Sequence, residues 1–364
     1  MNVKEDDFIT VLYDHQIMVL QKYGGISRYY YELFKRFKES KHIKPILYCW
    51  FSINTYFSPY LAISKFNLAK GRGWINRFLT ILYLKTHKID ILHPTYYNPY
   101  YIKRYKGKIV ITVYDMIHEL FPQYFSKDKV IEQKRLSIHR ADKIIAISQS
   151  TKRDILKIYP DIPESKIKVI YIASDFKKNE SQKLNYNFPK KFILFVGNRW
   201  IYKNYNRFFQ SVSRLLKDDK ELSLVCVGGG KFSDSEMEMH GNLSNRIFQM
   251  NVDDDILSFA YSHALCFVFP SLYEGFGIPT LEAFACDCPV VLSNTSSMPE
   301  VGGDAAVYFD PYDADDMSEK IKRVVYDSVL RQQMIIKGRN QLKKFDWNQI
   351  AKQTMECYKE VLKG

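Results

Sequence analysis

The sequence contains no apolar stretch long enough to cross a bilayer. A spanning helix needs about 20 consecutive apolar residues, and the apolar runs of this 364-residue chain are far shorter. Its first residues, 1–7, also lack the basic and then apolar pattern of a signal peptide. We therefore expect the protein to stay in the cytoplasm.

Cysteine is scarce and is not arranged in pairs that bind metal. The six cysteines include no C-x-x-C pair and no histidines at metal-ligand spacing. They are Cys49, Cys226, Cys266, Cys286, Cys288 and Cys357. Most lie inside apolar runs, so we predict reduced core residues and no metal site.

Glycine and proline are also too few for a disordered or fibrous chain. With 16 Gly, 13 Pro and 46% hydrophobic residues, the chain has enough apolar surface to offset the entropy of folding. Its length suits two domains rather than a single core. A ligand would then be expected in the cleft between them.

Acidic residues are in short supply only in the first half. Residues 1–175 carry 29 Lys and Arg against 16 Asp and Glu, whereas residues 176–364 carry 24 of each. This accounts for the whole net charge of +13. An excess of positive charge in one half of the chain suits an anionic partner such as a membrane surface, a lipid diphosphate or a nucleic acid. The alternative is that these lysines only keep the surface soluble.

Short apolar runs alternate with helical patterns along both halves. Most are continuous rather than alternating, as in parallel strands covered on both faces. The predicted strands are 8–13, 45–49, 89–92, 108–113, 143–147 and 168–171, then 192–196, 222–227, 247–249, 265–269 and 289–292. A polar stretch, 176–190, reads as a linker. We predict an α/β fold with domains 1–175 and 176–345, followed by a helix in 346–364.

The strongest motif is a strand, a glycine-containing loop and a helix over residues 269–283. The apolar strand stops at Pro270, and a helix begins near Pro279, which is favoured in a first turn. Ligands of parallel sheets bind at such strand ends. Glu274 in the loop and Glu282 in the predicted first helical turn could each accept two hydrogen bonds from a diol. Taken singly, each is better explained as a solvated or helix-capping charge.

The whole string resembles the Glu-x7-Glu signature of retaining glycosyltransferase family 4. The stretches 227–230, 299–306 and 307–311 also follow that family's C-terminal domain. The resemblance covers nearly the whole chain and implies a GT-B fold of two Rossmann-like domains, with the last helix returning to the first. It implies that Glu274 contacts the donor sugar and Glu282 the ribose. The backbone of Gly275, Phe276, Gly277 and Ile278 would face the sugar and diphosphate.

Two cations follow the first strand of the second half. Arg199 and Lys203 lie beyond that strand's carboxyl end, where they could neutralise a departing diphosphate. The pair resembles the Arg and Lys of the same family, the second of which precedes Asn as Lys203 precedes Asn204. Two exposed basic residues at the start of a helix are the alternative.

Further donor contacts are implied by resemblance alone. The Gly24-Gly25 turn before the first helix resembles the family's N-terminal glycine loop, especially in the mannosyltransferase B-like subgroup of O-polysaccharide assembly. That likeness is the reason to favour GDP-mannose as donor. Val252 resembles part of the base-contacting turn. The neighbouring run Asp253 to Asp255 is expected to cap a helix rather than bind a metal.

The acceptor side is marked by residues that follow the strand 108–113. We expect Asp115, His118 and Glu119 to be exposed on the cleft side. The family's active-site histidine falls where this chain has Tyr114, so either His118 replaces it or Asp115 acts alone. A structural His118 is the alternative. His93, at the end of an earlier strand, is expected to be structural.

The segment 70–85 mixes aromatics and cations along a predicted helix. It could rest on an anionic bilayer, although a buried helix with a lysine-bearing edge is the favoured interpretation. Contact with the inner face of the cytoplasmic membrane is therefore a second possibility for this protein.

These residues predict a retaining hexosyltransferase that needs no metal or other cofactor beyond its nucleotide-sugar donor. The acceptor would be a glycan or lipid-linked glycan in bacterial surface polysaccharide assembly, without a nucleic-acid partner. The enzyme alternative is transfer from a UDP-sugar to a soluble acceptor. A basic nucleic-acid-binding protein and a catalytically inactive scaffold are alternatives of other classes.

Overall fold

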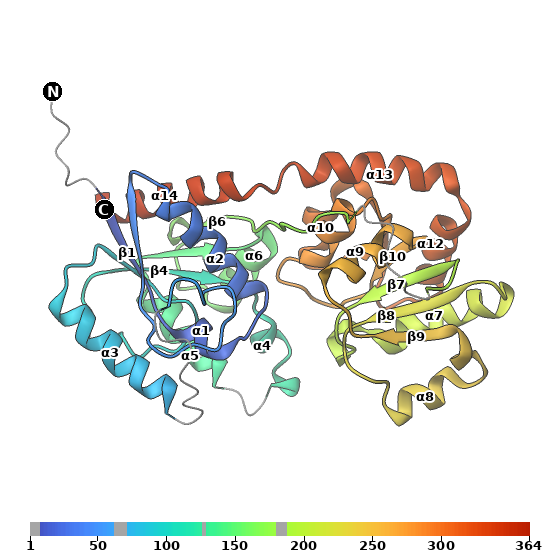
Figure 1. The fold of residues 1–364 in the computed structure, drawn as a ribbon, viewed down its shortest axis with the longest axis horizontal. Helices are drawn as coiled ribbons and strands as arrows, with labels where there is room; N and C mark the ends of the chain where they lie inside the picture. Colours follow the sequence, from blue (N-terminus) through green and yellow to red (C-terminus); the bar gives the residue numbers. More distant parts are fainter. Residues whose placement is uncertain (1–7, 62–70, 126–128, 180–187) are drawn as a thin grey trace. The chain divides into compact units, whose positions relative to one another are not determined.

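A computed structural model describes residues 8–61, 71–125, 129–179 and 188–364 (Figure 1). The chain forms two compact units. The first contains residues up to Ile172 together with Asp346–Gly364, and the second is Ala173–Phe345. The sequence placed this boundary after residue 175. Part of the predicted linker, residues 180–187, lies outside the described residues.

The first unit is built on a six-stranded parallel sheet in the order β2-β1-β3-β4-β5-β6. Its strands are β1 (Ile9–Tyr13), β2 (Ile43–Leu47), β3 (Ile91–His93), β4 (Lys108–Val113), β5 (Lys143–Ala146) and β6 (Ile167–Val169). Its helices are α1 (Gln16–Leu20), α2 (Gly25–Lys38), α3 (Arg72–Thr86), α4 (Ile117–Leu120), α5 (Val130–Arg140), α6 (Gln149–Ile158) and α14 (Trp347–Lys363), with short 3-10 helices at Pro122–Tyr124 and Glu164–Lys166. Because β1 pairs with both β2 and β3, the strand order reverses between β1 and β3.

The C-terminal helix α14 completes this first unit by packing against α2 and β4 (Figure 1). Hydrogen bonds of buried hydroxyl groups link this helix to the sheet. The Tyr358 hydroxyl lies 2.9 Å from the Tyr13 hydroxyl and 2.6 Å from His93 Nδ1, while His93 Nε2 lies 2.9 Å from Thr112 Oγ1. His93 is fully buried, and its expected structural role is confirmed.

Burial of His93 predicts a specific loss of stability in mild acid. It lowers the pKa of this imidazole from 6.5 to about 3. Below pH 6.5 the unfolded chain therefore binds a proton that the folded chain does not, so stability falls as the pH drops towards 3. In urea titrations, His93→Gln should reduce the loss between pH 7 and pH 5 by about 2 kcal/mol. The exposed His42→Gln control should leave that loss unchanged, and equal curves for both variants would contradict the assignment.

The second unit contains another six-stranded parallel sheet, in the order β12-β11-β10-β7-β8-β9. Its strands are β7 (Phe192–Val196), β8 (Ser223–Val227), β9 (Ile247–Met250), β10 (Cys266–Phe269), β11 (Val290–Ser293) and β12 (Ala306–Phe309). Its helices are α7 (Tyr205–Asp218), α8 (Asp234–His240), α9 (Asp254–His263), α10 (Ile278–Ala285), α11 (Met298–Gly302), α12 (Ala314–Tyr326) and α13 (Ser328–Leu342), with 3-10 helices at Ile201–Lys203, Gly241–Arg246 and Gly303–Ala305.

Both faces of this second sheet are covered, which explains its continuous apolar strands. Successive side chains of a strand point to opposite faces. Ile193 and Phe195 of β7 join the core cluster that also contains residues of α7 and α12. Phe192 and Leu194, on the other face, are equally buried. Helix α10 contacts α9, α13 and β11.

The predicted doubly covered parallel sheets are confirmed, with two differences. Strand β12 was not predicted, because Ala306–Phe309 was read only as part of a motif. The favoured burial of the helix at 70–85 was wrong. Within α3 only Asn76 and Thr80 are buried, since apolar residues such as Trp74, Phe78 and Leu82 recur every four positions on an exposed face. Lys70 lies outside the described residues.

All six cysteines are free and buried, as expected. Among the described helices, none combines the length and apolarity needed to cross a membrane.

Candidate functional site

Two of the predicted donor-site residues of the second unit, Lys203 and Glu274, meet where its strand order reverses. β7 leads to β8 and β9 on one side, and its other neighbour β10 leads to β11 and β12. Loops at the carboxyl ends of two such strands part in opposite directions and leave room for a ligand. Lys203 follows β7 and Glu274 follows β10, so the fold itself brings these two residues together.

Lys203 and Glu274 form a close ion pair at this point. Lys203 Nζ lies 2.5 Å from Glu274 Oε1, and both side chains are only 15% exposed. An ammonium has three N–H donors and a carboxylate has about four acceptor positions. Each side chain therefore keeps free hydrogen-bonding positions. The ammonium can still donate to an anionic group, and the carboxylate can still accept from the hydroxyls of a ring beside it.

The loop that carries Glu274 is held from two sides. The Glu274 amide donates to Ser296 Oγ at 3.0 Å, and Ser297 Oγ lies 2.9 Å from the carbonyl oxygens of Glu274 and Phe276. On its other side, the Leu272 amide of the same loop donates to the Tyr202 carbonyl, in the 3-10 helix Ile201–Lys203, at 2.8 Å. These bonds fix the position of Glu274 relative to the segment that carries Lys203.

The glycine loop leads directly into α10. Gly277 caps that helix with φ near 95°, a left-handed conformation that favours glycine, and Pro279 lies in its first turn. The backbone N–H groups at such a helix start favour an anionic group. Phe276 is buried edge-on against Phe345, so its side chain anchors the loop.

Glu282 lies deeper in α10 than the sequence indicated. The helix begins at Ile278, which places Glu282 in the second turn rather than the first. The Tyr261 hydroxyl donates to Glu282 Oε2 at 3.2 Å. A helix-capping charge is therefore the wrong explanation for this residue, because it lies beyond the N–H groups left free at the helix start.

Arg199 is engaged by a glycine-rich turn of its own unit. Its guanidinium bonds to Glu236 at 2.5 Å and to the carbonyls of Gly228, Gly230 and Lys231, and its side chain is only 5% exposed. Burial raises the pKa of Glu236, but the bonds from Arg199 and Ser233 outweigh it and the pKa is lowered. Arg199 thus shapes the loop after β8, and its predicted contact with a diphosphate stays a prediction.

The turn after β9 contains Val252, which is partly exposed. Asp253 next to it caps α9 by accepting a hydrogen bond from the Ile256 amide at 3.0 Å, as expected for this acidic run.

The described residues contain no group of three His, Cys, Asp or Glu side chains arranged to hold a metal ion.

Gly24 and Gly25 belong to the first unit, where they start α2. Gly24 is the N-cap, and a Cβ built on it would lie 2.7 Å from Gln21 Oε1. The Ser27 hydroxyl donates back to the Gly24 carbonyl at 3.0 Å. The turn is thus compact, and its contact with the donor remains a prediction.

The predicted acceptor-side residues form one turn held by a buried lysine. Lys134 Nζ donates to the Asp115 carbonyl and to Glu119 Oε2, both at 2.9 Å, and its side chain is fully buried. Asp115 Oδ1 accepts the Ile117 amide. His118 is partly exposed, with its ring centre 4.3 Å from that of Phe125.

One sequence expectation for this turn is wrong, and the structure also places Tyr114. The Glu119 carboxylate, expected to be exposed, is only 4% exposed because it pairs with Lys134. Tyr114, at the position of the family's histidine, is buried, with its ring edge-on to Tyr29. Desolvation raises the pKa of its hydroxyl well above the usual value, so Tyr114 stays neutral.

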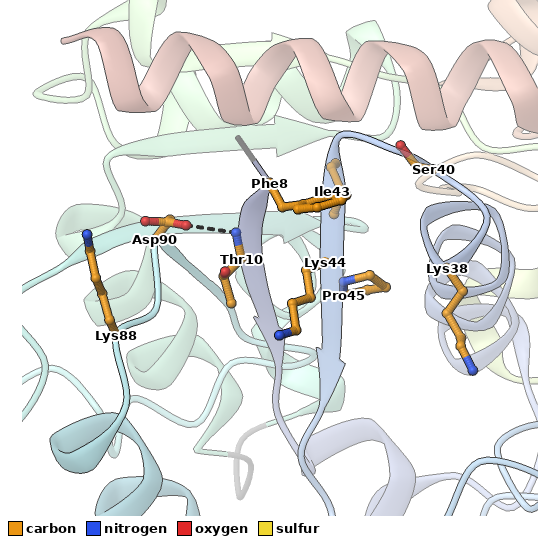
Figure 2. Close-up of a pocket in the computed structure, with 9 residues that line it drawn as sticks. All are labelled: Phe8, Thr10, Lys38, Ser40, Ile43, Lys44, Pro45, Lys88 and Asp90. Atoms are coloured by element: carbon orange, nitrogen blue, oxygen red, sulfur yellow. Dashed lines mark hydrogen bonds between the residues drawn. The ribbon is translucent and has the colours of Figure 1, made fainter. Parts of the chain in front are cut away.

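A cavity lies away from these sites, at the amino ends of β1 and β2. It measures about 740 Å³ and is lined by Lys38, Lys44 and Lys88 among others (Figure 2). Asp90 at its wall accepts the Thr10 amide at 2.8 Å. Because ligands of parallel sheets bind at the carboxyl ends, we attribute no donor or acceptor role to this hollow.

Three supporting residues were not predicted from the sequence. Lys134 gave no signal, because its α5 position reads as one more surface lysine. Ser297 gave no signal either, because nothing in the run Ser296 to Met298 marks it as a supporting residue. Glu236 could have been found, since Ser233 and Glu236 have the spacing of a capping box, which the structure contains.

Comparison with known proteins agrees with this architecture. A family model described as glycosyl transferases group 1 matches residues 176–341, and one described as glycosyltransferase family 4 matches residues 23–177. The O-antigen chain mannosyltransferase B of Escherichia coli is 28% identical over 365 residues, covering 92% of this chain and 96% of that protein.

Solved structures show the same fold at low identity. Sucrose-phosphate synthase from Thermosynechococcus elongatus superposes with a TM-score of 0.75 at 18% identity, covering 97% of this chain and 98% of the other. Anabaena HepE, solved with UDP and glucose, gives 0.73 at 16% identity, covering 96% and 99%. Both halves of the chain thus match glycosyltransferase models, and the chain belongs to glycosyltransferase family 4, with the two-domain GT-B fold.

Proposed function

We propose that this glycosyltransferase moves a mannosyl group, with retention of configuration, from GDP-mannose to a hydroxyl of a growing polysaccharide. The second unit would bind the nucleotide-sugar, and the basic first unit would bind the acceptor. The likeness to an O-antigen chain mannosyltransferase supports the mannosyl group and the setting of surface polysaccharide assembly.

The observation that carries this proposal is the ion pair between Lys203 and Glu274 at the reversal of strand order. In the proposed reaction, the bond between the anomeric carbon and the diphosphate oxygen breaks, and the acceptor oxygen bonds to the same face. The acceptor proton passes to the leaving diphosphate. Lys203, with the helix start of α10, would stabilise the charge that develops there.

Glu274 would stabilise the positive charge that develops on the sugar ring. As the leaving group departs, the ring becomes electron-poor, and a carboxylate that accepts hydrogen bonds from sugar hydroxyls is favoured there. Glu282 would accept from the ribose, and Tyr261 keeps its carboxylate oriented. No metal or other cofactor is required in this scheme, because Lys203 and the start of α10 would face the diphosphate.

A panel of nucleotide-sugars measured by thermal unfolding tests the donor. A ligand that binds only the folded chain at 100 times its Kd stabilises it by about 2.7 kcal/mol. We expect GDP-mannose to raise the melting temperature more than UDP-glucose, ADP-glucose or dTDP-glucose. NMR of the product should show the anomeric configuration of the donor, and an inverted product would refute the retaining mechanism.

The second candidate is transfer from a UDP-sugar. The similar fold of Anabaena HepE, solved with UDP and glucose, favours it. A larger thermal shift with UDP-glucose in the same panel would select this candidate over GDP-mannose.

A further inference from the structure

A second cavity, of about 650 Å³, lies at the carboxyl ends of β1 and β3 in the first unit. Its walls include His15 and Gln16, which follow β1, and Asn98, which follows β3. The strand order of this sheet reverses between these two strands. The cavity therefore lies where a parallel sheet binds a ligand, and its size is that of a small-molecule site.

A buried aspartate makes the floor of this cavity rigid. Asp14 is fully buried and accepts hydrogen bonds from Gln16, Thr95 and Tyr100. Gln16 in turn bonds through Oε1 to the Asn98 amide at 2.7 Å and through Nε2 to the Asn98 carbonyl at 3.2 Å. The loops after β1 and β3 are thereby locked together, and Asp14 has its own donors within the floor.

Arg77, which also lines the cavity, has no such pairing. It projects from α3, is partly buried, and lies with its guanidinium 5.8 Å from the centre of the Tyr100 ring. In the described parts of the chain, no carboxylate and no hydrogen-bond acceptor pairs with it. Lys129, at the start of α5, adds a second cation to the wall. A partly desolvated cation without a partner favours an anionic ligand.

Part of the remaining wall is apolar and leads to an exposed apolar stripe. Val19, Leu20 and Trp74 line the cavity. Trp74 is 71% exposed and stacks on Phe78, which is 56% exposed, with Leu82 one turn further along α3. An anion bound at Arg77 would thus have an apolar surface next to it.

We propose that this cavity binds the phosphate end of a lipid diphosphate, with the lipid chain along Trp74, Phe78 and Leu82. This deepens the proposed function and rests on it for one point, namely that the occupant is the lipid carrier of the glycan acceptor. The ligand class itself follows from an unpaired arginine, a second cation and an apolar wall in one hollow. A bilayer phospholipid offers the same chemistry, so the experiment separates the two sources.

Binding of farnesyl diphosphate to the full chain tests this proposal. We expect saturable binding, with farnesol and inorganic pyrophosphate each at least about tenfold weaker, because each lacks one half of the recognised group. Arg77→Gln should weaken farnesyl diphosphate binding about tenfold or more. Arg72→Gln, on the same helix but outside the cavity lining, is the matched control and should bind as the parent does.

Equal losses in the two arginine variants, or binding no better than that of pyrophosphate, would overturn the proposal. So would Arg77-dependent binding to phosphatidylglycerol vesicles without binding of soluble farnesyl diphosphate, because the occupant would then be the bilayer. Nucleotide-sugar binding is measured on the same variants and should be unchanged. If donors bind and farnesyl diphosphate does not, only this inference fails; if no donor binds, the proposed function fails.

Discussion

Glu274→Gln should lower turnover by about 10² to 10³ fold, the loss typical of removing one preorganised charged group at a reacting centre. The amide keeps the size of the carboxylate but loses its charge, so it no longer stabilises the electron-poor sugar ring. Its loop should keep its shape, since Ser296 and Ser297 hold the backbone rather than the side chain. Turnover is measured by release of nucleoside diphosphate from the donor with acceptor present.

The control for this variant is Glu319→Gln, which changes a carboxylate that is 76% exposed on α12 of the same unit. It should retain full turnover. The melting temperature of Glu274→Gln should stay within a few degrees of the parent, which separates lost chemistry from lost folding. Turnover within threefold of the parent would refute the role assigned to Glu274.

Lys203→Gln should weaken binding of the nucleoside diphosphate by about 10 to 100 fold and leave binding of the nucleoside unchanged. The charge-assisted bond to phosphate accounts for a difference of this size. The nucleoside lacks the diphosphate and therefore does not sense the lost cation. Isothermal titration with GDP and with guanosine, or with the pair that the donor panel selects, measures both affinities.

Lys217→Gln, which removes an exposed cation of α7, is the matched control and should change neither affinity. Arg199→Gln is expected to differ from both, because its guanidinium also holds the carbonyls of the loop after β8. It should lower the melting temperature as well as the diphosphate affinity. Equal losses for nucleoside and nucleoside diphosphate in Lys203→Gln would contradict a contact with phosphate.

Much of the fold followed from local pattern. The continuous runs at 108–113 and 192–196 predicted buried parallel strands, because residues covered on both faces leave no polar alternation. Strand β12 was not predicted, since it lies at the edge of the sheet and most of its residues are only partly buried. The exposure of the apolar face of α3 was not predicted either, because an apolar residue at every fourth position of a helix normally faces the core.

The candidate site, like the fold, was predicted only in part from the sequence. The sequence by itself determined that Glu274 and Lys203 each follow a buried strand, because strand, loop and helix signals are local. Only the tertiary structure decided that their side chains meet, since pairing of β7 with β10 joins segments far apart in the chain. The same holds for Lys134 beneath Asp115, for Glu236 beside Arg199 and for the unpaired Arg77. Burial and charge pairing are properties of neighbours in space, which local sequence does not specify.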